Sequence, residues 1–109
     1  MKELTVLEQL ILAAIVNLED EAYSVTIRNK VKEITKKNIM YGTLYNALGQ
    51  LLQKGYVTKT KGNPIPERRG RRKMFYQPTT KGKEALLKTL DLQKSIWNSL
   101  QDLVRSHRE

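Results

Sequence analysis

The sequence predicts a mainly α-helical fold with a small β-hairpin, in the α+β class. Between residues 5 and 54, and again after residue 79, apolar residues recur at three- and four-residue intervals, as they do on one face of a helix. Between these parts, the runs YVTKT and KMFYQ alternate in polarity around a segment rich in Gly, Pro and charge. Two such runs around a turn segment indicate a hairpin.

The length and charge of the chain limit its organisation and its partners. Its 109 residues suit one domain with at most an appendage, and its net charge of +9 favours an anionic partner. The chain lacks cysteine, which excludes disulfides and thiolate metal sites and fits a reducing cytoplasm. No apolar run approaches the ~20 residues that cross a bilayer, and the acidic Glu3 and Glu8 are untypical of a secretion signal. We therefore expect a cytoplasmic protein.

A first helix is expected from Thr5 to Leu18. Thr5 and Glu8 have the spacing of a capping box, in which each side chain accepts a hydrogen bond from the backbone of the other residue. The residues that keep the helical period are Leu4, Leu7, Leu10, Ile11, Ala14, Ile15 and Leu18. A second set widens the apolar stripe: Leu12, Ala13 and Val16. We expect this helix to lie between its own core and another surface, such as a partner subunit.

A second helix is expected after Ser24, which is a favourable N-cap residue. Its inward residues are Ile27, Val31 and Ile34, and its exposed residues are Arg28, Lys30, Lys32 and Lys36. Tyr23 is assigned to the core. This helix forms the first half of a predicted helix-turn-helix, and the turn after it supplies candidate contacts to DNA phosphates: Lys36, Lys37 and Asn38. A solvated polar turn is an equally good interpretation of these residues.

The third helix is expected from Tyr41 to Lys54, with Gly55 ending it. Its apolar face comprises Tyr41, Leu44, Tyr45, Leu48, Leu51 and Leu52. The opposite face is small and polar, as suits contact with base edges in a major groove, and comprises Thr43, Asn46, Ala47, Gln50 and Gln53. The candidate base contacts are Thr43, Asn46, Gln50 and, through its hydroxyl at the helix start, Tyr41. Tyr45 is assigned to the core, because aromatic residues at helical spacing are more often buried.

The hairpin carries most of the net charge. Between Lys59 and Lys73 there are seven basic residues and one acid, a net charge of +6. The basic residues are Lys59, Lys61, Arg68, Arg69, Arg71, Arg72 and Lys73. A polyanion would relieve their repulsion, and guanidinium groups suit bidentate contact with phosphate. A solvated loop is the alternative, but the helix before the hairpin favours contact with a DNA backbone. Phe75 and Tyr76 are expected on opposite faces of the second strand.

The segments GTLYNAL, LLQKGYV and GRRKMFYQPTTKGKEAL together resemble the PadR family of bacterial transcriptional regulators, from Leu4 to Leu90. The resemblance implies a winged helix whose GTLY helix enters DNA, and a two-fold dimer. Two departures from the family pattern stand out. Met40 and Tyr41 replace a capping residue and a proline, which should loosen the helix start, since a cap is worth ~1 kcal/mol. Gly49 and Gln50 replace basic residues, which shifts phosphate binding towards the hairpin, the wing of such a fold.

The last helix is expected from Thr80 to His107, with Thr79 as its cap, and spans ~42 Å at ~1.5 Å per residue. This exceeds what a compact winged helix covers. An apolar stripe on its outer half is assigned to a dimer interface: Leu90, Ile96, Trp97, Leu100, Leu103 and Val104. Folding back would need a break near Asp91 to Gln93, where Gly and Pro are absent. We expect a DNA-binding domain over residues 1–78 and a dimerisation helix over residues 79–109.

Trp97 has two interpretations. Tryptophan is enriched at interface hot spots, which favours an anchor of the dimer. In some small proteins similar to this one, a tryptophan on the dimerisation helix lines a cavity at the two-fold axis that takes flat aromatic compounds. The resemblance therefore makes Trp97 a candidate ligand contact, and Val16 and Leu100 are further candidates to line the same cavity.

The sequence favours a regulator over an enzyme. The one histidine, His107, lies in the last turn, and the chain has neither a cysteine nucleophile nor HExxH or P-loop spacing. We expect no catalytic residue, metal site or cofactor. The sequence predicts a homodimeric winged-helix repressor that binds a pseudo-palindromic site in double-stranded DNA. The alternatives are a dimeric sensor of planar aromatic molecules, with its site near Trp97, and a winged helix that serves as a protein adaptor.

Overall fold

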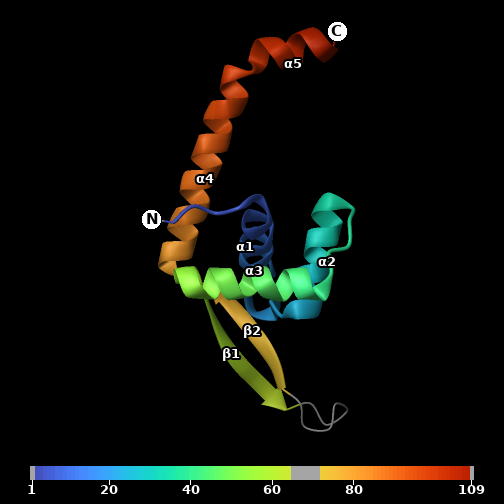
Figure 1. Ribbon diagram of the computed structural model, residues 1–109, viewed down its shortest axis with the longest axis vertical. Coiled ribbons are helices and arrows are strands. Elements are labelled where there is room, and N and C mark those ends of the chain that lie inside the picture. Colours follow the sequence, from blue (N-terminus) through green and yellow to red (C-terminus); the bar gives the residue numbers. More distant parts are fainter. Residues whose placement is uncertain (1, 65–71, 109) are drawn as a thin grey trace.

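The computed structural model describes residues 2–64 and 72–108. Its elements, in chain order, are α1 (Val6–Leu18), the 3₁₀ turn η1 (Glu19–Glu21), α2 (Ser24–Thr35), α3 (Tyr41–Lys54), β1 (Val57–Pro64), β2 (Arg72–Pro78), α4 (Thr80–Ser99) and α5 (Gln101–Arg108). The helices α1, α2 and α3 pack together, the wing β1–β2 extends from one side and α4 leads away on the other (Figure 1). This confirms the expected fold, a winged helix-turn-helix with a long C-terminal helical segment.

The start of α1 follows the expected capping box, whereas the start of α2 does not follow the prediction. Thr5 Oγ1 accepts from Glu8 N at 3.1 Å, and Thr5 N donates to Glu8 Oε1 at 2.8 Å. In α2, Tyr23 is the N-cap residue and Ser24 is already helical, so the assignment of Ser24 as the cap is wrong. Thr26 explains the shift by one residue, because its hydroxyl accepts from Tyr23 N at 3.0 Å.

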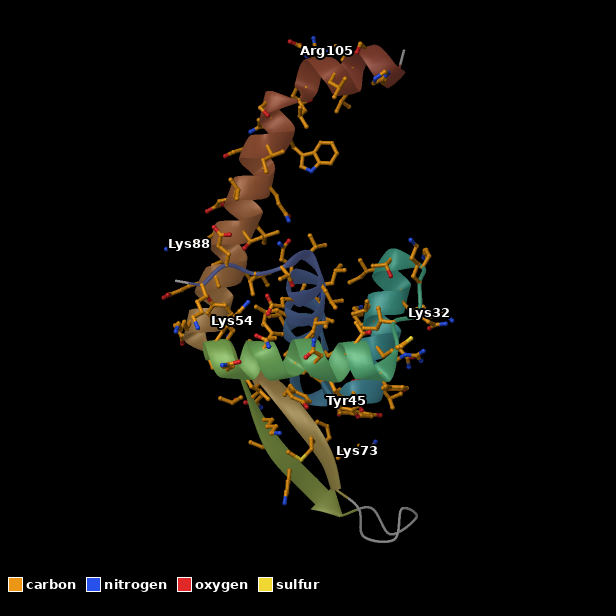
Figure 2. All side chains as sticks on the ribbon, in the orientation of Figure 1. Lys32, Tyr45, Lys54, Lys73, Lys88 and Arg105 are labelled. Carbon is orange, nitrogen blue, oxygen red and sulfur yellow. The ribbon has the colours of Figure 1, made fainter. Side chains whose placement is uncertain are left out.

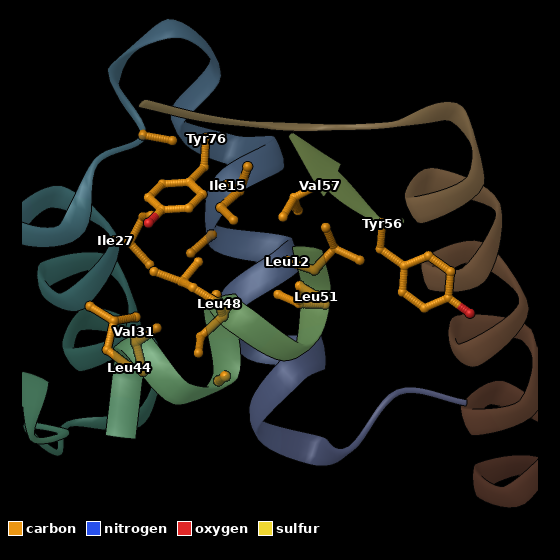
Figure 3. Close-up of a cluster of buried hydrophobic side chains, with 14 of the residues drawn as sticks. Leu12, Ile15, Ile27, Val31, Leu44, Leu48, Leu51, Tyr56, Val57 and Tyr76 are labelled. Atoms are coloured by element: carbon orange, nitrogen blue, oxygen red, sulfur yellow. The ribbon is translucent and has the colours of Figure 1, made fainter. Parts of the chain in front are cut away.

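The core lies where the three helices meet the base of the wing. Its largest fully buried side chains are Tyr56, Ile11, Leu12, Ile15, Ile27, Leu44, Leu48, Leu51 and Val31 (Figure 3). They come from α1, α2, α3 and the residue before β1, so the core holds the three helices against one another. Ile34, which the sequence analysis placed in this core, is 47% exposed because it lies one turn beyond Val31, near the end of α2.

The wing is a two-stranded antiparallel sheet in which Val57 pairs with Pro78 and Lys61 with Met74. Its base is tied to the helices, since Tyr76 N donates to Ala22 O at 2.8 Å. Tyr76 is buried, while Phe75 is half-buried with its ring edge against Tyr23, their centroids 5.5 Å apart. The two residues therefore lie on opposite faces of β2, as the alternation predicts.

The C-terminal segment is two helices rather than the single helix expected from Thr80 to His107. The chain leaves helical geometry at Leu100, where φ is −106° and ψ is 11°. Leu100 N bonds Trp97 O at 3.0 Å in a tighter turn, and the Ser99 hydroxyl donates to Ile96 O at 2.6 Å. The helix therefore breaks without Gly or Pro, at a turn where a serine hydroxyl also bonds the backbone.

The molecule is elongated because α4 leads away from the other helices (Figure 1). Its dimensions are 58 × 30 × 22 Å, and its radius of gyration is 16.5 Å, whereas a compact chain of this length has one of ~13 Å. Within the described residues, no helix combines the length and the apolar character needed to cross a membrane.

Candidate nucleic-acid interface

The helix α3 presents a polar face to solvent. Thr43, Asn46 and Gln50, the predicted base contacts, are all exposed. Behind them, Leu44, Leu48 and Leu51 are at most 1% exposed, which fixes the rotation of the helix about its axis. Ala47, which was grouped with the polar face, is 6% exposed and belongs to the core.

Tyr41 and Tyr45 lie on the exposed face of α3. Tyr45 is 52% exposed, so its assignment to the core is wrong. Its ring stacks on that of Tyr41, with centroids 6.3 Å apart and planes inclined by 29°, as a spacing of four residues on a helix allows. Figure 2 shows Tyr45 along the edge of α3, on the side of the wing. Burial raises the pKa of Tyr76, and the nearby Tyr45 raises it further. Tyr45 therefore joins Tyr41 as an exposed aromatic residue of α3.

Arg28 links α2 to the start of α3, a role that the sequence analysis did not identify. Its Nε donates to Ile39 O at 2.6 Å, and its Cζ lies 4.7 Å from the centroid of the Tyr41 ring. The partners are 11 and 13 positions away in the chain, so periodicity, which reports only on neighbouring turns, gave no signal for these contacts.

The turn between α2 and α3 exposes the residues predicted to contact phosphates. Lys36, Lys37 and Asn38 are all exposed. Lys36 ends α2 in the left-handed region, with φ at 65°, and its N donates to Lys32 O at 2.7 Å. The turn thus holds two adjacent lysines just before α3.

The lysines of the wing that the structure describes differ in their exposure to solvent. Lys59 and Lys61 are exposed on β1. Lys73, predicted to contact DNA, is half-buried instead, and its Nζ lies 4.0 Å from the centroid of the Tyr23 ring. This cation–π contact joins β2 to the residue before α2. Arg72 begins β2, whereas Arg68, Arg69 and Arg71 lie outside the described residues.

A junction of close contacts connects the end of α3 to the start of α4. Gly55 ends α3 with φ at 79°, and its carbonyl accepts from Thr79 Oγ1 at 2.7 Å. Thr79 N donates to Tyr56 O at 3.0 Å, and a Cβ on Gly82 would lie only 2.1 Å from that same oxygen. The backbones of the two segments therefore touch at this point.

The N-terminal segment is also attached to the end of α3. Lys54 Nζ lies 2.6 Å from Glu8 Oε1 and 2.9 Å from Glu8 Oε2, and the carboxylate is only 3% exposed. Burial of Glu8 opposes its ionisation, but the bonds from Lys54 and Thr5 outweigh burial, so the pKa of Glu8 is lowered. This ion pair fixes α1 against the last turn of α3.

The predicted dimer residues form an exposed apolar surface on α4 and at the following bend. The exposed fractions are 44% for Leu90, 49% for Ile96, 59% for Trp97, 38% for Leu100 and 51% for Leu103. Val104 on α5 is half-buried. Val16 on α1 is 36% exposed, and Gln9 on α1 accepts from Gln93 Nε2 on α4 at 2.6 Å.

Solved structures with the same fold include regulators from bacteria. A PadR family transcription regulator from hypervirulent Clostridium difficile matches with a TM-score of 0.77 at 22% identity, covering 92% of this chain and 99% of that one. A PadR-like transcriptional regulator from Bacillus cereus matches with a TM-score of 0.74 at 21% identity, covering 91% of each chain. A protein from Streptococcus mutans matches with a TM-score of 0.69 at 28% identity, covering 99% of this chain and 95% of that one.

The sequence itself was compared with curated proteins and with protein families. No curated protein sequence matches the chain. The model of the transcriptional regulator PadR-like family matches residues 11–88, which include the helix-turn-helix, the wing and the first part of α4. The chain therefore belongs to the PadR-like family of transcriptional regulators.

Proposed function

We propose that this transcriptional regulator is a repressor that binds a pseudo-palindromic DNA site as a homodimer. The observation that carries the proposal is the exposed face of α3. Thr43, Asn46 and Gln50 offer hydrogen-bonding groups on a helix that buried leucines hold at a fixed rotation. Such groups read base edges when the helix lies in a major groove. Repression would follow from occupation of promoter DNA.

Basic residues on both sides of α3 support this docking. Lys36 and Lys37 are exposed before the helix, and Lys59 and Lys61 are exposed on the wing after it. Contacts of these lysines with phosphates would fix the position of the protein on DNA, while the side chains of α3 would read the sequence. Because Lys73 contacts Tyr23, we assign it to orienting the wing rather than to a phosphate.

The apolar surface of α4 supports a dimer. Leu90, Ile96 and Trp97 are between 44% and 59% exposed in the single chain, and a contiguous apolar stripe of this kind marks an interface. A two-fold arrangement buries the same stripe on both copies. Two recognition helices related by that axis would read half-sites about 34 Å apart, or a multiple of that distance.

Selection of bound sequences from a random DNA pool at physiological salt tests the proposal. The site recovered should have two-fold symmetry. Asn46→Ala should then relax the preference at one base pair of each half-site, a loss of about 1–3 kcal/mol in discrimination. Arg71→Ala together with Arg72→Ala should weaken binding to all sequences and lower the salt slope by roughly one for each phosphate that the variant no longer binds.

Lys88→Ala serves as the control for the removal of charge. Lys88 is exposed on α4, on the opposite side of α3 from the wing (Figure 2), and its substitution should leave the sequence preference unchanged. Recovery of random sequences from the pool, or an unchanged preference in the Asn46→Ala variant, would contradict base reading by α3.

Trp97 supports a second output, the sensing of a planar aromatic molecule. Its side chain is 59% exposed on the same apolar stripe as Leu100. In a dimer it would either anchor the interface or stack on a ligand between the subunits. Titration with a panel of planar aromatic cations should quench Trp97 fluorescence and change DNA affinity if it binds a ligand. Equal fluorescence across the whole panel would leave the anchor as its role.

A further inference from the structure

The start of the recognition helix lacks the usual side-chain cap. Met40 is the N-cap residue of α3, with φ at −71° and ψ at 147°, and no side chain bonds the first amides of the helix from that position. A methionine has no acceptor suited to the task, and this one is 72% exposed. The first amides of any helix have no partner within the helix, so an uncapped end tends to fray.

Arg28 contacts the chain on both sides of this uncapped position. Its Nε donates to Ile39 O at 2.6 Å, one residue before Met40. Its guanidinium carbon lies 4.7 Å from the centroid of Tyr41, one residue after Met40, which is within the range of a cation–π contact. The Tyr41 ring in turn stacks on Tyr45, one helical turn further along.

These contacts form a brace from α2 to the first turn of α3. Arg28 lies in the first half of α2, whose neighbours Ile27 and Val31 are at most 1% exposed, so the brace starts from a rigid support. It ends on a backbone carbonyl and on an aromatic ring, and both restrict the path of the chain into α3. Thr43 and Asn46 follow in the same and the next turn, and their positions therefore depend on this brace.

We propose that Arg28 is a positioning residue that holds the first turn of α3 in place of the absent N-cap. Its role in DNA binding is indirect: it orders the turn that carries Thr43 and Asn46 without contacting a base. This inference rests on the proposed function, because it assumes that α3 reads DNA. The ordering of the turn itself exists in the free protein and is measurable there.

Amide hydrogen exchange in the free protein is the first test. Leu44 N donates to Met40 O at 3.0 Å, so the amides from Leu44 to Asn46 report on the first helical turn. Arg28→Ala should speed their exchange about tenfold, the size of effect expected when a cap is removed. Met40→Ser in the Arg28→Ala background should slow it again, because Met40 already has the extended backbone of a cap and serine supplies the missing acceptor.

DNA affinity measured over a range of salt concentrations is the second test. Arg28→Ala should weaken binding to the selected site about tenfold with an unchanged salt slope, and adding Met40→Ser should recover most of the affinity. Lys88→Ala, which also removes one positive charge, should keep the affinity of the wild type. An unchanged slope separates positioning from a direct bond, since the slope falls by about one for each phosphate that the protein ceases to bind.

Two results would overturn the proposal. One is exchange of the Leu44 to Asn46 amides at the wild-type rate in Arg28→Ala. The other is a lower salt slope that Met40→Ser does not correct, which would make Arg28 a direct phosphate contact. If the wild type selected no DNA sequence, the proposed function alone would fail, and the exchange experiment would still decide the role of Arg28.

Discussion

Glu8 connects the start of α1 to the end of α3 through one carboxylate. It accepts from Thr5 N at the start of α1 and lies 2.6 Å from Lys54 Nζ at the end of α3. Lys54 also donates to Glu3 O at 3.0 Å. The side chain of Glu8 is 3% exposed and that of Lys54 is 14% exposed, so water screens their attraction poorly. Removing one partner would leave the charge of the other without compensation.

The stability that Glu8 contributes should depend on pH. Its folded pKa is lowered, so its contribution is fully present above the ordinary value of 4.5 and is lost as the pH falls through the folded pKa. At pH 7, Glu8→Gln should lower the free energy of unfolding by about 2 kcal/mol. Urea denaturation followed by circular dichroism should show this difference between wild type and variant shrinking below pH 4.5. A difference that stays constant as the pH falls well below that value would contradict the ionic role.

At this scale, the sequence predicts contacts between near neighbours better than contacts between distant ones. The spacing of Thr5 and Glu8 predicted their capping box, but the partner that buries Glu8, Lys54, is 46 positions away. Tyr45 shows a related limit. Periodicity places it beside the leucines of α3, but the width of the buried arc depends on what packs against the helix. In this fold that arc consists of Leu44, Ala47, Leu48 and Leu51, and Tyr45 lies outside it.

At the scale of the elements, α3 and α4 are joined through the backbone. The end of α3 and the start of α4 touch through backbone atoms at Tyr56 and Gly82, without an intervening side chain. Thr79 contributes twice, since its hydroxyl donates to Gly55 O and also accepts from Gly82 N at 3.0 Å. The orientation of α3 is therefore set partly by the first turn of α4.

Two glycine substitutions should have opposite effects on stability. Gly82→Ala should destabilise the protein by about 1–3 kcal/mol, because its Cβ would lie 2.1 Å from Tyr56 O. Gly49→Ala should stabilise it by about 1 kcal/mol, because alanine favours the helix and the added Cβ would point into open space. Thermal and urea unfolding of both variants measure this. A Gly82→Ala variant as stable as the wild type would show that α4 shifts readily on Tyr56.

The existence of each element was easier to predict than its ends. Three helices, a hairpin and a long C-terminal helical segment follow from periods of apolar residues that the core satisfies. The errors lie at the ends, where local hydrogen bonds decide. Thr26 moves the start of α2 back by one residue, and the Ser99 hydroxyl bonds Ile96 O where α4 ends. In both places a hydroxyl group bonds the backbone, and periodicity carries no information on such bonds.

At the scale of the whole molecule, the chain divides its apolar residues between a core and an exposed stripe. The core holds the winged helix together, whereas the stripe from Leu90 to Leu103 lies on the part of α4 and α5 that extends from it. The stripe is recognisable in the sequence because its spacing continues past the length that one domain covers. The bend at Leu100 directs the last residues of the stripe, and it lies at a turn closed by local hydrogen bonds that the apolar spacing does not reveal.

Charges placed in the stripe should separate the proposed dimer. Ile96→Lys with Leu100→Lys should give a folded monomer, because both side chains are exposed in the single chain and contribute little to its core. Sedimentation equilibrium should report the mass of one chain, 12.6 kDa, with the helical circular dichroism of the wild type. Affinity for a site with two half-sites should fall by at least tenfold, as the second contact is no longer coupled to the first.

Asn98→Lys is the matched control for this variant. Asn98 is exposed on α4 between the two substituted residues, and it is polar rather than part of the stripe. This variant should keep the mass of the wild type in solution. A dimer that tolerates both lysines in the stripe would place the subunit contact elsewhere.

The length of α4 also affects how the protein behaves during purification. In gel filtration, a chain with a radius of gyration of 16.5 Å and a longest dimension of 58 Å elutes with globular proteins of larger mass. The elution volume of the monomer would therefore resemble that of a compact dimer. Light scattering at the peak, which responds to mass and not to shape, distinguishes the two.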